Sequence, residues 1–348
     1  MGCRFKIYRL LLCVGIVLAN VACTSSPTQS SSQQALPNKY ATGFHIIDED
    51  TCLLLEVMEP HEQYRIAKPL NRIATSSTTQ IGFLGALNAL DKVVAVCNPE
   101  LIYTTLPSKP IDLGDSMKPS SERALQAQLD ALLVVSYGQN NPEAERLARL
   151  GVKTIYINEW REESPLARAE WVRFVGALVG KLELADSLFN CIEQRYLGEA
   201  ERQTKNRGTV SVMLGNNFKG TWYMPSGNTY MGYLLHDAGA NYRYAEDMRG
   251  ESVPMTIEQV LNQFSEADVW IGASANSMAE LADLDEKHQW FKAYKNGRVY
   301  NWRKQYRIDG ANNFWERGVV HPEEILSDIV NVLDGAPDST LHYANRLY

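Results

Sequence analysis

The chain has 348 residues, 45% of them hydrophobic and 22% charged, proportions typical of a folded globular protein. Its 34 Lys and Arg against 41 Asp and Glu give a net charge of −7, and no basic stretch could follow a phosphate backbone, which argues against a nucleic-acid partner. The longest uncharged apolar run, Leu10 to Ala19, is about half of the ~20 residues that a membrane-spanning helix needs, which argues against an integral membrane protein.

The first 22 residues have the pattern of a secretory signal: three positive charges, the apolar run, and the small residue Ala22 before Cys23. The segment Asn20-Val-Ala-Cys23 resembles the lipobox of bacterial lipoproteins, in which the Cys sulfur carries a diacylglycerol. Asn20 stands where Leu is usual, so ordinary signal cleavage is the alternative. We expect a lipoprotein signal over residues 1–22, lipidation of Cys23, and a flexible tether rich in Ser, Thr and Gln over residues 23–40.

Removal of the signal leaves 31 basic and 41 acidic residues, a net charge of −10. With Cys23 lipidated, the remaining thiols are Cys52, Cys97 and Cys191, an odd number that cannot all pair within the chain. We interpret them as unpaired, with a Cys52–Cys97 bridge as the alternative in an oxidising periplasm.

After the tether, apolar runs at 44–48 and 51–58 predict a hairpin that decorates a sheet edge. From Ile73 onward strands and helices alternate, which predicts a mostly parallel sheet. The expected strands are 73–75, 93–96, 132–136 and 154–158, and the expected helices are 80–90 and 143–150.

Residues 165–206 carry no strand signal, and their apolar residues recur at helical spacing. We expect a long helical connector, broken near 176–180, whose second part spans roughly 30 Å. The alternation then restarts, with strands expected at 210–214, 269–272 and 299–302 and helices at 229–238, 257–264 and 322–333. The predicted fold is α/β: two Rossmann-like lobes (41–164 and 207–348) with mostly parallel sheets, joined by the connecting helix, and a ligand cleft between them.

Motifs of common enzymes are absent: the sequence has no Gly-Xaa-Ser-Xaa-Gly, no phosphate-binding loop with Lys, no His-Glu-Xaa-Xaa-His and no Cys-Xaa-Xaa-Cys. The six His residues are scattered without ligand spacing. The sequence therefore predicts neither catalysis nor a direct metal site.

Three segments that follow predicted strands are rich in aromatic, amide and basic residues: 137–141, 216–223 and 302–307. Ligand sites of α/β proteins form at strand ends. Flat rings offer large contact areas, and Arg grips carboxylates through paired hydrogen bonds, so these segments suit a bulky, partly anionic, planar or chelated molecule. The alternative is that individual rings cap the edges of the core.

At this point the chain resembles the substrate-binding proteins of ATP-driven importers for iron siderophores, haem and cobalamin. The resemblance covers about residues 70–333 and rests on the order of several segments: 76–96, Gly114-Asp115, Ser-Glu-Arg-Ala-Leu at 121–125, 130–135, 150–155, Ile-Glu-Gln-Val-Leu at 257–261, 267–271 and 293–300. The amino-terminal hairpin and Asn-Phe-Trp-Glu-Arg-Gly at 313–318 resemble a Bacteroidetes-type lipoprotein branch of that family.

The resemblance implies that Glu122 and Glu258 dock on Arg residues of the permease; the alternative is that both are helix-start carboxylates favoured by the helix dipole. It also implies ligand contacts from residues of both lobes: Tyr137, Trp222, Tyr223, Arg303 and Tyr306, with Asn216 and Asn217 as further candidates. Tyr103 and Trp160 lie on similar loops, and Arg307 beside Arg303 could grip a ligand carboxylate, so we expect these three residues to contact the ligand as well.

We therefore expect a monomeric, lipid-anchored periplasmic protein of a Gram-negative bacterium that binds a ferric siderophore or related metal chelate as cargo, has no cofactor of its own, and delivers the chelate to a permease dimer with its ATPase. Cobalamin or haem is the alternative cargo. A chelate-processing enzyme and a surface adhesion or scaffold lipoprotein are the competing classes.

Overall fold

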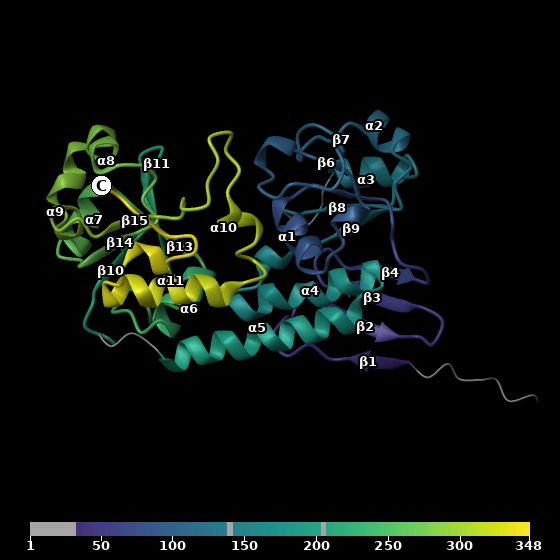
Figure 1. Cartoon of the computed structure of the whole chain (residues 1–348), viewed down its shortest axis with the longest axis horizontal. Coiled ribbons are helices and arrows are strands. Elements are labelled where there is room, and N and C mark those ends of the chain that lie inside the picture. Colours follow the sequence, from purple (N-terminus) through teal and green to yellow (C-terminus); the bar gives the residue numbers. More distant parts are fainter. Residues whose placement is uncertain (1–32, 138–141, 203–206) are drawn as a thin grey trace, which may run out of the picture.

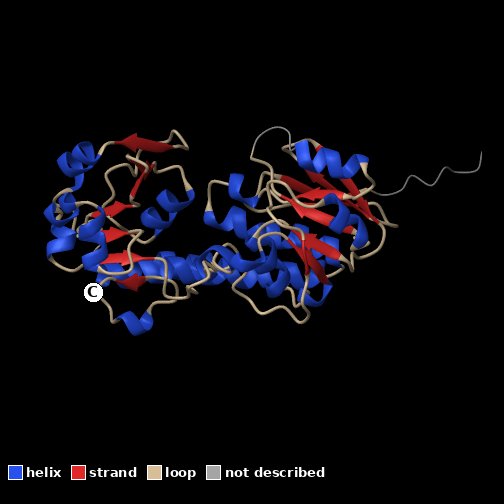
Figure 2. Cartoon of the chain, turned by 90° about the horizontal axis from the view of Figure 1, so that it is seen from above, coloured by secondary structure: helices blue, strands red, loops and turns tan. Residues whose placement is uncertain are grey.

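The computed structural model describes residues 33–137, 142–202 and 207–348. The signal, Cys23 and part of the 137–141 segment lie outside this part of the chain. Two lobes stand side by side and are joined along one edge by helices (Figure 1). Figure 2 shows from above that each lobe has its own strands with helices around them.

In the part of the chain that the structure describes, the strands belong to four sheets. They are β1 (Gln34–Leu36), β2 (Phe44–Asp48), β3 (Leu53–Val57), β4 (Glu62–Ile66), β5 (Ile73–Thr75), β6 (Val93–Val96), β7 (Ile111–Asp112), β8 (Ala131–Val134), β9 (Thr154–Tyr156), β10 (Val212–Leu214), β11 (Asn217–Phe218), β12 (Thr221–Pro225), β13 (Ser252–Met255), β14 (Val269–Ile271), β15 (Val299–Asn301) and β16 (Asn345–Arg346).

The α-helices are α1 (Thr78–Ala86), α2 (Ser121–Gln126), α3 (Pro142–Arg149), α4 (Pro165–Val179), α5 (Leu182–Arg202), α6 (Tyr230–Asp237), α7 (Ile257–Phe264), α8 (Met278–Leu284), α9 (Lys292–Lys295), α10 (Asn313–Glu316) and α11 (Pro322–Asp334). Short 3-10 helices are η1 (Leu90–Lys92), η2 (Pro99–Leu101), η3 (Glu159–Arg161), η4 (Glu286–Trp290) and η5 (Asp338–Thr340).

The amino-terminal lobe is built on a parallel five-stranded sheet of order β7-β6-β5-β8-β9. The expected edge hairpin is larger than the sequence indicates, because β1 and β4 extend β2 and β3 to a four-stranded antiparallel sheet. Helix α4 contacts both β2 and α1, and its residues share one core with both sheets.

The connector is a pair of helices that pack against each other. Helix α4 ends at Gly180 in the left-handed conformation (φ 71°), within the region where the sequence predicts a break. At Gly176 an added Cβ would lie 2.5 Å from the Cβ of Ala185, so glycine allows α4 and α5 to approach closely. The 21 residues of α5 span about 30 Å and reach the carboxy-terminal lobe, where α5 packs on α11.

The carboxy-terminal lobe contains the sheet β10-β14-β15-β16, parallel except for the last strand, and a separate antiparallel sheet β11-β12-β13. The predicted α/β class with two sheet-based lobes and a connecting helix is thus confirmed. The antiparallel sheet and β16 are additions that strand-helix alternation does not indicate.

Cys52, Cys97 and Cys191 are free thiols in the structure. Cys97 is buried, and this burial raises the pKa of its thiol to about 12. Among the described residues, no helix combines the length and the apolar character needed to cross a bilayer.

Candidate functional site

A cavity of about 170 Å³ lies where the lobes meet. Its walls come from α1, η3 and α4 on one side and from α6, α10 and α11 on the other. Its polar and aromatic lining residues are Thr79, Glu159, Trp160, Arg168, Tyr230, Phe314 and Trp315. We call this space the floor cavity.

Two charged residues line the floor cavity from the amino-terminal lobe. Glu159 is 2% exposed, and burial raises the pKa of its carboxyl group against the opposing effects of a hydrogen bond from Thr79 and the charge of Arg168. Burial also lowers the pKa of Arg168, whose guanidinium carbon lies 4.4 Å from the ring centroid of Tyr230. Arg168 is half-buried, whereas every other residue of α4 is fully buried, which is consistent with its place at the cavity.

The pKa of Tyr230 is raised to about 12, chiefly by burial and against the effect of the Arg168 charge. Its phenol is therefore neutral at physiological pH. The floor cavity thus combines a buried carboxyl group, a guanidinium group and aromatic rings.

Helix α10 is a second bridge between the lobes. The carboxylate of Glu316 is 1% exposed and accepts hydrogen bonds from the backbone amides of Tyr103 (2.7 Å) and Thr104 (2.9 Å). Phe314 belongs to the core of the carboxy-terminal lobe, while α10 contacts α1 of the other lobe. Within the described residues, the lobes are therefore joined both by the connector and through α10, which favours small hinge or shear movements over wide opening.

Close packing of α1 on α10 depends on Gly82. A Cβ added there would lie 2.0 Å from the carbonyl oxygen of Glu316. Because backbone cannot yield as a flexible side chain does, we expect Gly82→Ala to destabilise the protein by about 1–3 kcal/mol in urea unfolding.

Gly85→Ala is the matched control for Gly82→Ala, because Gly85 lies on the same helix and its added Cβ would meet only methyl groups of Leu90, at 3.9 Å. Removal of a helical glycine there should be neutral or slightly stabilising. Equal effects of the two substitutions would contradict the close approach of α1 and α10.

Of the residues expected to bind ligand, Tyr137 and Trp160 lie together on the amino-terminal lobe. Their ring centroids are 5.7 Å apart, and their residues are 69% and 36% exposed. Trp160 lines the floor cavity. Tyr103 instead lines a separate hollow of about 450 Å³ on the α1–α10 junction.

Arg303, Tyr306 and Arg307 lie on the loop between β15 and α10, which stands beside the gap between the lobes in Figure 1. The Arg303 guanidinium lies 5.1 Å from the Tyr306 ring centroid and donates to Asn276 at 2.7 Å. Arg307 is paired with Asp309 at 2.5 Å. The structure thus brings Arg303 and Tyr306 together and gives Arg307 an acidic neighbour.

Segment 216–223 is a hairpin of β11 and β12, which alters the expectation for its residues. Trp222 is 0% exposed, donates from Nε1 to the carbonyl of Leu214 at 2.7 Å, and packs against Trp270 and Phe291. It has no free face for a ligand, so the expectation for Trp222 is corrected to a core residue.

The other expected ligand contacts on this hairpin, unlike Trp222, are not buried in the core. Tyr223 is exposed, as the alternation along β12 requires. Asn216 and Asn217 are half-buried; Asn217 accepts from the amide of Gly220 in the turn, and Asn216 donates to the carbonyl of Asn217. None of the three is among the residues that line the floor cavity.

Glu122 and Glu258 occupy the first turns of α2 and α7, one on each lobe, and both are exposed. Glu258 is paired with Lys287 at 2.7 Å. Hydrogen bonding to Lys287 is the main cause that lowers the pKa of Glu258 to about 2, so this carboxylate is charged at all physiological pH values.

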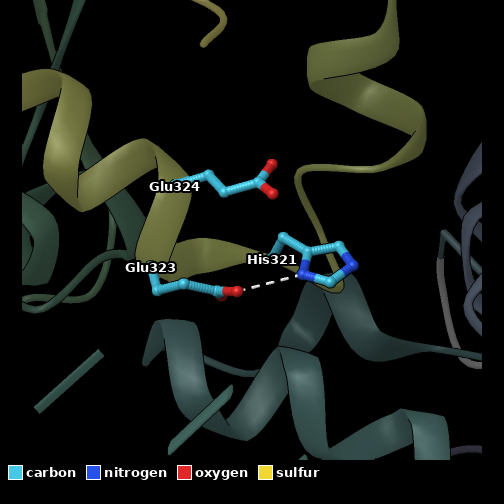
Figure 3. A group of neighbouring side chains, drawn as sticks. All are labelled: His321, Glu323 and Glu324. Carbon is cyan, nitrogen blue, oxygen red and sulfur yellow. Dashed lines mark hydrogen bonds and ion pairs between the residues drawn. The ribbon is translucent and has the colours of Figure 1, made fainter. Parts of the chain in front are cut away.

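His321, Glu323 and Glu324 at the start of α11 form a cluster in which one candidate ligand atom from each lies within 4.8 Å of the others. Figure 3 shows His321 facing Glu323, with Nδ1 3.0 Å from Oε1, and Glu324 standing apart. Glu324 accepts from Arg317 (2.7 Å) and from the hydroxyl of Tyr343 (2.5 Å). Because Arg317 already supplies positive charge, we assign these side chains a structural role at the helix start.

Comparison with known proteins decides the family. The periplasmic binding protein family matches residues 73–306, two thirds of the chain and parts of both lobes. The chain belongs to the periplasmic binding protein family. It is thus a member of a family of binding proteins and not of enzymes.

A curated relative of this periplasmic binding protein is the uncharacterized lipoprotein MJ0878 of Methanocaldococcus jannaschii, 24% identical over 280 residues. The match covers 76% of this chain but 65% of that protein, so the chain spans less than two thirds of the relative's length.

Solved structures share the fold at low identity. One is an ABC-type Fe3+-hydroxamate transport protein from Saccharomonospora viridis, with TM-score 0.58 and 18% identity over 79% of this chain and 97% of that one. Another is the periplasmic vitamin B12 binding protein BtuF of Vibrio cholerae, with TM-score 0.55 and 15% identity over 76% and 97%.

The residues of this binding protein that line the floor cavity but were not among the expected ligand contacts include Thr79, Glu159, Arg168, Tyr230, Phe314 and Trp315. Glu159 comes after strand β9 and directly before Trp160. Because ligand sites of α/β proteins form at strand ends, the same reasoning that selects Trp160 also selects Glu159. A charge at Arg168 within an apolar helical run is also a usable signal, because buried charges need a partner or a function. No sequence signal places Tyr230 opposite them.

Proposed function

We propose that this periplasmic binding protein captures a metal chelate, a ferric siderophore or a related complex, in the gap between its lobes and delivers it to the permease of an ATP-driven importer. A lipid on Cys23 would hold it at the membrane, as the lipobox-like segment and a relative named as a lipoprotein both support. The observation that carries the proposal is the floor cavity, to which both lobes contribute aromatic side chains.

The exposed groups around the gap support a chelate as cargo. Tyr137 and Trp160 offer ring faces from one lobe, and Arg303 with Tyr306 offers a cation and a ring from the other. Tyr223 and Arg307 are further exposed candidates on the second lobe, and Asn216 and Asn217 lie on the same hairpin as Tyr223. Tyr103 borders the neighbouring hollow. Such groups bind large planar or anionic complexes through area and paired hydrogen bonds.

Cobalamin is the second candidate cargo, since one structure of this fold is named as a vitamin B12 binding protein. Haem is a third candidate. Trp160 on the floor cavity would serve any of these flat ligands.

Ligand titration of the full-length protein in detergent tests the proposal. Ferric hydroxamate and catecholate siderophores, haem and cobalamin are added in turn, and Trp fluorescence and visible spectra are recorded. We expect saturable binding of one class, weakened at least about tenfold by Trp160→Ala, because interfacial aromatic residues are common hot spots. Trp290→Ala, at an exposed Trp of η4, is the control. Chemical turnover of a chelate would favour an enzyme, and no binding at all would contradict the proposal.

A further inference from the structure

We propose that the floor cavity is a subsite for a primary carboxamide of the ligand, and hence that the cargo is a chelate with uncharged amide arms. This inference rests on the proposed capture of a chelate between the lobes. It concerns Glu159 and Arg168, which present an acceptor and a donor to the same small space.

Glu159 provides the acceptor. Its Oε2 is buried and has no hydrogen-bond partner among the described residues. Thr79, which lines the same cavity, lowers the pKa of the carboxyl group by hydrogen bonding and so opposes the effect of burial. A buried acceptor without a donor is unfavourable, so a ligand group that carries N–H hydrogens into the cavity would be stabilised there.

Arg168 provides the donor, held in a fixed orientation. Its Nε donates to the carbonyl oxygen of Glu162 at 2.8 Å, and its guanidinium plane lies over the Tyr230 ring. Within the described parts of the chain, no acceptor is recorded for its two terminal nitrogens. These nitrogens remain available to a ligand oxygen at the edge of the cavity.

The pair selects the charge of the ligand group. A carboxylate would be attracted by Arg168 but repelled by Glu159, and an ammonium group would meet the opposite conflict. A primary amide is neutral, donates through its NH₂ group to Glu159 and accepts through its carbonyl from Arg168. It is also planar, which suits the rings of Trp160 and Phe314, and a volume of about 170 Å³ can hold it with its methylene arm, since a water molecule occupies roughly 30 Å³.

The ligand preference of this subsite depends on the protonation state of the Glu159 carboxyl group. Burial raises the pKa of this carboxyl group, and a protonated Glu159 would itself donate a hydrogen bond. The site would then present two donors and prefer a carboxylate. The two protonation states thus predict opposite ligand preferences.

The test compares dicyanocobinamide, whose side arms include primary amides, with its isomeric monocarboxylic acids, in each of which one amide is hydrolysed. Binding to the full-length protein in detergent is followed by visible spectroscopy at neutral pH. We expect at least one acid isomer to bind about tenfold or more weakly than the amide, because a site built for a hydrogen-bonding group rejects a mismatch strongly. Glu159→Gln should reduce that difference to less than about threefold. Glu163→Gln, at an exposed carboxylate of the same segment, should leave it unchanged.

The outcomes separate the two proposals. Equal or tighter binding of every acid isomer overturns the carboxamide subsite. Binding of haem or a ferric catecholate without any binding of cobinamide also overturns it, but leaves the proposed function standing. If no chelate of any class binds, both proposals fail.

Discussion

Glu170→Ala is expected to destabilise the protein by about 3–5 kcal/mol, because it removes the acceptor that fixes the amino-terminal segment to the connector. Glu170 is 0% exposed and accepts hydrogen bonds from the backbone amides of Lys39, Tyr40 and Ala41, each at 2.8 Å. It also pairs with Arg173 at 3.2 Å. Truncation would leave the amides and a guanidinium group without their common partner. Urea unfolding of the purified protein measures the loss.

Two further substitutions separate the charge of Glu170 from its shape. Glu170→Gln keeps the volume but turns an NH₂ group toward amide donors, so it should lose part of the stability. Glu183→Ala removes an exposed carboxylate from α5 and should change the free energy of unfolding by less than about 0.5 kcal/mol. A Glu170→Ala protein within 1 kcal/mol of wild type would show that these hydrogen bonds do not fix the segment.

Reversal of both proposed docking charges, Glu122→Arg with Glu258→Arg, should abolish transport. The two carboxylates are exposed on separate lobes, so their reversal would place two positive charges, a change of four charge units, against a basic permease surface. Chelate affinity should stay within about twofold, since neither residue lines the floor cavity. The measurement is chelate uptake into vesicles that contain the permease and its ATPase, alongside a binding titration.

The control for the docking variant reverses Glu145 and Glu266, two other exposed carboxylates, and so changes the net charge equally. It should transport normally. Transport by the Glu122/Glu258 variant, or equal loss in the control, would refute specific docking. Glu258 already pairs with Lys287, so a permease cation has to displace this lysine to reach it.

Helices with local end signals were predictable from the sequence. Helix α7 has the predicted bounds, because Thr256 and Gln259 form a capping box and Ile257, Val260 and Phe264 lie on one buried face. Helix α11 begins at Pro322 and stops before Gly335, which takes the left-handed conformation at φ 68°. In each case the residues that set the boundary are neighbours in the chain.

The sheet β11-β12-β13 was missed because the pairing of β12 with β13 is not local. Met255 pairs with Trp222 across more than thirty residues of chain. One local sign was present: Trp222 and Met224 are buried while Tyr223 between them is exposed, the alternation of a half-covered strand. This two-residue alternation of buried and exposed side chains predicts that Trp222 lies in the core and not at a ligand.

The site was predictable only on the side where residues follow strand ends. Tyr137 and Trp160 were found by that rule and lie together. The floor cavity also needs Arg168 from α4 and Tyr230 from α6, and only the packing of the connector against the second lobe brings these helices together. No spacing in the sequence encodes that approach.

Hydrogen–deuterium exchange with and without the chelate that binds in titration tests capture between the lobes most directly, because amide protection reports local order along the whole chain. The account predicts that the chelate protects peptides from both lobes at once, around Trp160 in one and over residues 302–315 in the other. Protection confined to one lobe, or located away from these segments, would contradict it.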